Sequence, residues 1–221
     1  ITSVIFSSRK ADFNQVIGIR YGGAVSTPIY FEPTLKAIQE QLEKAYPDRR
    51  VQLQDTNEDF SRVLYTVSSS ANPPVHYLMA DLKRIHLVGA ERPWIDTDAM
   101  RQTELVYYTA RDGLEIPGFL TLPKGWKKGD ARLPLVVLPH GGPWSRDSAG
   151  WDNSGWPQFL ATRGYAVLQP QYRGSTGFGR ELWLAGDAEW GQKMQDDKDD
   201  GAAWLVSEGI ADPNRMAMFG Y

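Results

Sequence analysis

The chain has 221 residues, of which 42% are hydrophobic and 23% charged, proportions close to those of average soluble globular proteins. Its formal net charge of −3 is too near neutral to favour nucleic acid or an anionic membrane surface as a partner. The absence of cysteine excludes disulfides, thiolate metal sites and a cysteine nucleophile.

The first hundred residues are predicted to be mainly β structure. Short apolar runs at 4–6 and 16–21 predict two strands, and Pro28 to Pro33 is interpreted as a connector. A short amphipathic helix comes next. Its apolar face is expected to carry Leu35, Ile38, Leu42 and Ala45. Because the chain begins with Ile1 rather than Met, we expect the natural N-terminus to lie outside it, which leaves cytoplasm and periplasm equally open.

Four further strands are predicted in a tight series, with turn-like segments between them at 57–59, 71–74 and 81–83. The four ranges are Arg50–Gln54, Arg62–Ser68, Val75–Ala80 and Arg84–Val88. Four antiparallel strands in about forty residues is the size of one propeller blade. Periodicity alone predicts an antiparallel sheet, and the interpretation as a propeller depends on the motifs in the second half of the chain.

The pattern changes after a polar boundary near Pro93 to Gln102. A hairpin is predicted around the Asp112-Gly113 turn, and buried strands are then predicted to alternate with helices. The predicted strands are 105–110, 115–122, 133–138, 165–168 and 215–219, and the predicted helices are 156–162 and 192–207. Alternating strands and helices imply βαβ units and a largely parallel sheet. We therefore predict two domains, residues 1–100 and 101–221.

The strongest chemical signal is His140-Gly141-Gly142-Pro143, directly after a predicted buried strand. Two glycines there let the backbone turn sharply and expose its N–H groups. Acyl transfer needs such donors, because its tetrahedral intermediate places negative charge on the former carbonyl oxygen. The alternative is that the glycines merely form a tight loop.

A second glycine-rich segment, Gln171 to Gly179, comes directly after the next predicted strand. Its glycine spacing does not fit GxGxxG, and no Gly-Lys-Ser/Thr is present after it, so phosphate binding is not expected. We expect Arg173 to hold this loop through a salt bridge. The last residues, Met216 to Tyr221, form an apolar run into Gly-x, which is how a GxSxG nucleophile elbow begins, although many strands end in this way.

Taken together and in order, these segments resemble the prolyl oligopeptidase family of serine peptidases, and most closely its acylaminoacyl-peptidase and dipeptidyl-aminopeptidase-like members. The resemblance is dense from about Glu104 to Tyr221 and looser before Met100. The segments that carry it are YYTARDGLEIPGFLTLP at 107–123, LVVLPHGGP at 135–143, YRGSTGFG at 172–179, QDDKDDGAAW at 195–204 and GIADPNRMAMFGY at 209–221.

The resemblance implies an α/β plus all-β fold, with the C-terminal blades of a β-propeller at 1–100 and the N-terminal half of an α/β-hydrolase domain at 101–221. It also implies hydrolysis of short peptides or acyl-peptides by a Ser-Asp-His triad, without metal or cofactor. In this family the triad residues come after the position of Tyr221, so the chain is expected to be an inactive fragment that ends just before the nucleophile. The Gly141 N–H is the implied oxyanion donor, and His140 occupies the oxyanion strand rather than acting as general base.

The remaining candidate residues favour structural roles. His76 and His86 lie in predicted blade strands, where packing is expected. The acidic run at 196–200 spreads over more than one helix face and has no histidine nearby, so we interpret it as capping and solvating the helix, with Arg173 as a possible ion-pair partner. Trp144, Trp151 and Trp156 could line a cleft near the glycine turn, or pack in the core.

Two rival functions remain open at this point. One is a small-molecule esterase or amidase of the α/β-hydrolase fold, which the absence of a propeller before Met100 would favour. The other is a non-catalytic propeller protein that binds peptides, which a residue other than serine after Tyr221 would favour.

Overall fold

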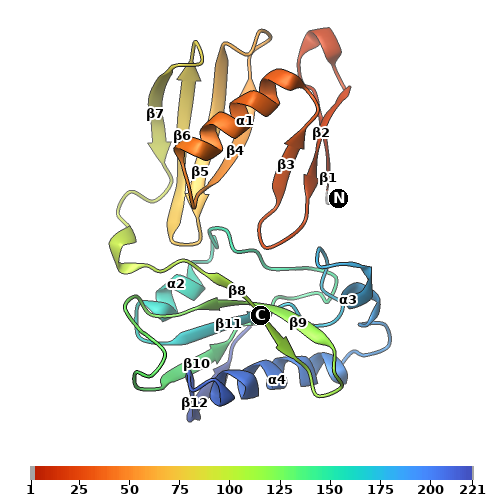
Figure 1. The fold of residues 1–221 in the computed structure, drawn as a ribbon, viewed down its shortest axis with the longest axis vertical. Helices are drawn as coiled ribbons and strands as arrows, with labels where there is room; N and C mark the ends of the chain where they lie inside the picture. Colours follow the sequence, from red (N-terminus) through yellow and green to blue (C-terminus); the bar gives the residue numbers. More distant parts are fainter. Residues whose placement is uncertain (1–2, 221) are drawn as a thin grey trace. The chain divides into compact units, whose positions relative to one another are not determined.

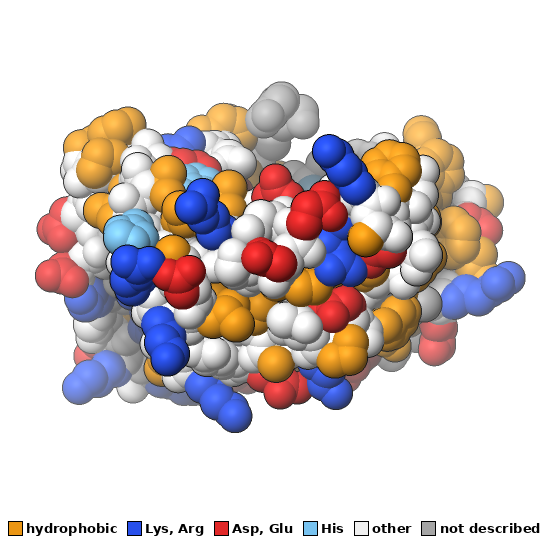
Figure 2. Space-filling view, turned by 90° about the horizontal axis from the view of Figure 1, so that it is seen from above, with side chains coloured by type: hydrophobic (Ala, Val, Ile, Leu, Met, Phe, Trp, Pro, Cys, Tyr) orange, Lys and Arg blue, Asp and Glu red, His pale blue; other side chains and the backbone are white. Residues whose placement is uncertain are grey.

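The computed structural model describes residues 3–220, and its chain divides into two compact units, residues 1–95 and 96–221 (Figure 1). Among the described residues, no helix combines the length and apolar character needed to cross a membrane. Figure 2 shows basic and acidic side chains interspersed with apolar ones, so neither sign of charge dominates that face.

The first unit consists of two antiparallel sheets and one α-helix. The three-stranded sheet contains β1 (Ser3–Phe6), β2 (Val16–Tyr21) and β3 (Thr27–Tyr30), with a short 3₁₀ helix at Lys10–Asp12. Helix α1 (Pro33–Ala45) leads to a four-stranded sheet of β4 (Arg50–Thr56), β5 (Arg62–Ser69), β6 (Asn72–Ala80) and β7 (Arg84–Ala90). Each strand of this second sheet pairs with the next one along the chain.

The core of the first unit forms where α1 packs against these sheets. Leu35, Ile38 and Leu42 are buried on the predicted helix face, whereas Ala45, predicted for the same face, is exposed. Each buried aliphatic side chain contributes about 1.5–3 kcal/mol relative to an exposed one. The Glu32 side chain accepts a hydrogen bond from the backbone N–H of Leu35, which caps the helix start.

Two predictions in this unit, the connector at 28–33 and the turn at 71–74, are wrong where prolines lie within strands. Pro28 lies inside β3, where it pairs with Arg20 at the sheet edge, and an edge strand tolerates the missing N–H. Pro73 and Pro74 lie at the start of β6, before its pairing with β7 begins at Val75. Proline is acceptable in the first residues of a strand for the same reason.

The second unit is a mixed five-stranded sheet with helices. Its strands are β8 (Glu104–Thr109), β9 (Glu115–Thr121), β10 (Leu133–Val137), β11 (Ala166–Pro170) and β12 (Ala211–Met218), in the order β12-β10-β11-β9-β8. The β10 strand runs parallel to β11 and β12, while β9 is antiparallel to β11 and to β8. The helices are α2 (Trp156–Ala161), α3 (Arg180–Leu184) and α4 (Lys193–Ser207), with a 3₁₀ turn at Thr97–Ala99. The predicted hairpin, the longer helix and the two buried strands β10 and β11 are therefore confirmed, whereas β12 is a strand that is exposed over most of its length.

Helix α4 packs closely on this sheet because it carries a glycine where strands β8 and β11 approach. A Cβ on Gly201 would lie 2.8 Å from side-chain atoms of Leu168 and Tyr108. Leu205, one turn later, is fully buried in the same core. Gly209, just beyond the helix, has the left-handed φ of +74° that the sequence predicts.

Three details of this unit were not predicted. Helix α3 lies between the glycine-rich segment and the predicted helix at 192–207, where no element was predicted, and β12 begins at Ala211 rather than at Arg215. Asp197 is fully buried, so the interpretation of the whole acidic run as a solvated surface is wrong at this position. An ion pair with Arg173 accounts for its burial, because a buried carboxylate needs a partner.

Candidate active site

The glycine turn lies at the carboxyl end of β10, the central strand of the parallel group β12-β10-β11. The chain leaves the sheet after Leu138, whose N–H donates to the Leu168 carbonyl of β11. Gly142 has a φ of +142°, and a Cβ there would lie 2.9 Å from the backbone nitrogen of Trp144. A side chain at this position would therefore strain the turn. Ligands of open α/β sheets commonly bind at this edge.

The turn presents backbone donors to a cavity of about 550 Å³. Among residues 3–220, the N–H groups of Gly141 and Gly142 have no hydrogen-bond acceptor. Both glycines are exposed, and both line the cavity together with Trp156 and Gly220. Free N–H groups at a concave surface can bind an anionic oxygen, which is the chemistry that acyl transfer requires.

The imidazole of His140 is held by hydrogen bonds at both nitrogens. Its Nδ1 lies 2.9 Å from the Gly141 carbonyl oxygen, which can only accept, so Nδ1 is the protonated donor. Its Nε2 lies 2.8 Å from Ser175 Oγ. Burial lowers the pKa of His140, and the ring is therefore neutral at neutral pH. These contacts favour a structural role for this histidine over general-base catalysis.

The loop after β11 contacts the glycine turn through Tyr172. The phenol ring stacks on His140 with 4.6 Å between ring centroids and 19° between planes. The Tyr172 hydroxyl donates a hydrogen bond of 2.7 Å to the His140 carbonyl oxygen. The sequence showed that Tyr172 precedes the predicted salt-bridge arginine, but not that it reaches a turn 32 residues earlier.

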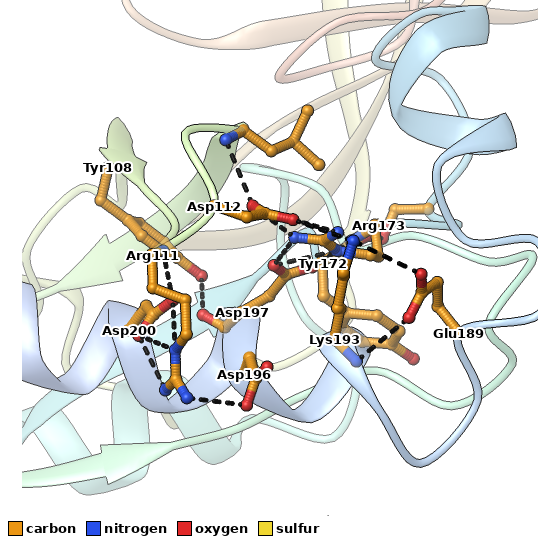
Figure 3. Close-up of polar contacts among 12 residues, drawn as sticks. Tyr108, Arg111, Asp112, Tyr172, Arg173, Glu189, Lys193, Asp196, Asp197 and Asp200 are labelled. Carbon is orange, nitrogen blue, oxygen red and sulfur yellow. Dashed lines mark hydrogen bonds and ion pairs between the residues drawn. The ribbon is translucent and has the colours of Figure 1, made fainter.

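Arg173 fixes the same loop through a cluster that we call the Arg173 cluster, consisting of Asp112, Arg173 and Asp197 (Figure 3). The guanidinium donates to both Asp197 carboxylate oxygens and to both oxygens of Asp112. The Arg173 backbone N–H also donates to Asp197 Oδ2, at 2.9 Å. These bonds hold the pKa of Asp112 well below its usual range and raise that of Arg173. The predicted structural salt bridge of Arg173 is confirmed.

Asp147 is a cavity residue that the sequence did not single out. Burial is the main cause that raises its pKa to about 6, and the neighbouring Asp152 carboxylate adds to the effect. Its backbone N–H donates to Gln171 Oε1, at 2.9 Å. A carboxyl group with such a pKa changes charge in the physiological range, a property that clusters at functional sites.

The other residues considered from sequence lie in different places. Trp156 lines the cavity, whereas Trp144 pairs with Trp190, at 5.5 Å between ring centroids. His76 and His86 lie in β6 and β7 of the first unit. Within residues 3–220, no group of three or more His, Cys, Asp or Glu side chains is placed to hold a metal ion.

Comparison with known proteins relates this chain to one family. The profile of the prolyl oligopeptidase family matches residues 151–221. Dipeptidyl aminopeptidase BIII of Pseudoxanthomonas mexicana is 36% identical over 197 residues, which cover 86% of this chain and 28% of that protein. The acylamino-acid-releasing enzyme of Homo sapiens is 33% identical over 108 residues, covering 49% of this chain and 14% of that enzyme.

A solved structure shares the fold. The structure of a puromycin-hydrolyzing peptidase from Mycobacterium tuberculosis superposes with a TM-score of 0.70 at 22% identity, covering 92% of this chain and 31% of that one. The chain thus spans less than a third of the length of each of these relatives.

Proposed function

We propose that the protein is a serine peptidase that hydrolyses short peptides or acyl-peptides, because this chain belongs to the prolyl oligopeptidase family. The glycine turn is the observation on which this proposal rests. It offers two backbone N–H groups without intramolecular acceptors among the described residues, at the carboxyl edge of a parallel sheet and facing a cavity. In the proposed reaction, the Gly141 N–H stabilises the oxyanion, and His140 supports the turn.

The architecture we infer for the protein is a β-propeller joined to an α/β-hydrolase domain. The sheet β4–β7 supports the first part, because four consecutive antiparallel strands make up a propeller blade. The parallel strands β10, β11 and β12, with α2 and α4 between them in sequence, support the second part. We assign the propeller to the first unit and the hydrolase domain to the second, predicted from the sequence as residues 1–100 and 101–221; the boundary between the two compact units lies five residues earlier, after Ile95.

The proposed mechanism is that of a serine triad. The serine oxygen attacks the peptide carbonyl carbon while a histidine takes the hydroxyl proton, and the carbonyl oxygen becomes an oxyanion near Gly141. Collapse breaks the C–N bond, and the histidine returns the proton to the leaving amine. Water then hydrolyses the acyl-enzyme by the same two steps. We assign the serine, aspartate and histidine of this triad to positions beyond residue 221, so residues 1–221 alone are inactive.

Labelling with a fluorophosphonate, which forms adducts with activated serines, tests this proposal. The full-length protein should gain one adduct by intact mass, and its labelled peptide should map outside residues 1–221. The 221-residue chain serves as a matched control and should remain unmodified. An adduct within residues 1–221 would overturn the assignment of the nucleophile.

Substrate class is tested separately with the full-length protein. Chromogenic amides of free dipeptides or of acylated amino acids should be hydrolysed, with a higher kcat/KM than an amide of a simple fatty acid of matched size. Hydrolysis of a simple acyl ester without hydrolysis of any of these amides would instead support the esterase alternative. Absence of both labelling and hydrolysis would refute the catalytic proposal itself.

A further inference from the structure

One peptide group of the glycine turn is held from its carbonyl side. The carbonyl oxygen of His140 accepts the hydrogen bond of 2.7 Å from Tyr172, while the N–H of the same peptide group belongs to Gly141. The peptide bond between these residues is trans, so its C=O and N–H point in opposite directions. Fixing the oxygen therefore fixes the direction of the N–H.

We propose that Tyr172 is a positioning residue that directs the Gly141 N–H toward the cavity. This inference rests on the proposed function, because it assigns Tyr172 to the oxyanion site of that reaction. Preorganised donors stabilise a developing charge far better than donors that must first reorient. A displacement of about 1 Å in a catalytic group can cost about 100-fold in rate. The hydroxyl of Tyr172 matters here because it restrains the donor.

The Tyr172 side chain is itself fixed from several directions. Tyr172 is 4% exposed, and its ring stacks on that of His140. The Lys198 ammonium lies 4.3 Å from the ring centroid. The backbone carbonyl of Tyr172 accepts a hydrogen bond of 3.0 Å from the backbone N–H of Ser175, and the next residue, Arg173, belongs to the Arg173 cluster. Burial also raises the pKa of Tyr172, so its phenol remains a donor at physiological pH.

A purely structural role for this hydrogen bond is the competing explanation, since buried hydroxyls usually find an acceptor. Tyr108 provides a matched control that separates the positioning role of Tyr172 from a purely structural one. Tyr108 is 3% exposed, and its hydroxyl donates to the backbone carbonyl of Asp197 at 2.8 Å, a contact that does not involve the glycine turn. Tyr172→Phe and Tyr108→Phe each remove one buried hydrogen bond to a carbonyl and keep the ring.

The experiment compares these two variants in the full-length protein. Both should lose similar stability in urea unfolding. Only Tyr172→Phe should lower kcat, by about 10–100-fold, with KM changed less than about threefold, because a transition-state contact is weakened. A peptide aldehyde, whose adduct oxygen mimics the oxyanion, should bind the Tyr172 variant more weakly by a similar factor. Introducing 4-aminophenylalanine at position 172 retains a donor and should restore kcat.

The outcomes separate the inference from the proposed function. If the wild-type protein neither hydrolyses peptides nor reacts with a fluorophosphonate, the proposed function is wrong. If the wild type is active and the two Phe variants have equal kcat, the positioning role of Tyr172 is wrong. Should Tyr172→Phe not fold, 4-fluorophenylalanine, which fills the space of the hydroxyl without a donor, replaces it. An active 4-fluoro variant would also overturn the inference.

Discussion

Replacing Asp197 with asparagine should strongly destabilise the protein, because it removes one charge from the buried Arg173 cluster. The Arg173 side chain is 4% exposed and that of Asp197 is fully buried. Breaking such a pair from one side costs about 3–5 kcal/mol, since the remaining charge stays buried. Asp112 continues to accept from the guanidinium, and asparagine keeps one acceptor oxygen. We therefore expect a loss of about 2–3 kcal/mol.

Urea unfolding monitored by tryptophan fluorescence measures this loss, and thermal unfolding should show a midpoint lower by about 10 °C. Asp196→Asn is the matched control, because it removes the same charge from the neighbouring residue of α4. The side chain of Asp196 is 36% exposed and pairs with that of Arg111, which is 56% exposed. An exposed pair contributes about 1 kcal/mol at most. If the two variants differ by less than about 1 kcal/mol, the buried cluster does not stabilise the fold as argued.

Two further predictions concern packing and protonation in the second unit. Gly201→Ala should destabilise the protein by about 1–3 kcal/mol in urea unfolding although alanine favours helices, because the new methyl group would clash with Tyr108 and Leu168. As a control, Ala203→Gly at an exposed position of the same helix should cost about 1 kcal/mol. If Gly201→Ala stabilised the protein, the close packing of α4 on the sheet would be contradicted. Asp147→Asn should leave unfolding unchanged near pH 4 and stabilise the protein by about 2 kcal/mol at pH 8. Burial raises the pKa of Asp147 in the folded protein to about 6, so ionisation of the wild-type carboxyl lowers stability as the pH rises from about 4 to 6. Equal effects of Asp147→Asn on stability at pH 4 and pH 8 would refute the burial argument.

The elements of the fold were largely predictable from local sequence. Helix α4 and strands β10 and β11 have apolar patterns that match their burial, because a strand inside a parallel sheet is covered on both faces. The errors at Pro28 and Pro73 have one cause. Proline indicates a break in the middle of a sheet but is tolerated at an edge or at a strand start, and sheet order is not visible in a short window.

The candidate site likewise combines features that the sequence predicted with contacts that it did not. The sequence by itself determined the glycine turn, because a strand that runs into two glycines is a local pattern, and it indicated that Arg173 holds a loop. Only the tertiary structure decided which aspartates Arg173 meets, since Asp112 lies 61 residues and Asp197 lies 24 residues away in sequence. It also brought the Tyr172 hydroxyl to the His140 carbonyl. These contacts depend on the order and register of β9, β10 and β11. Strand order and register arise from long-range pairing, so they have no signature in a single segment of sequence.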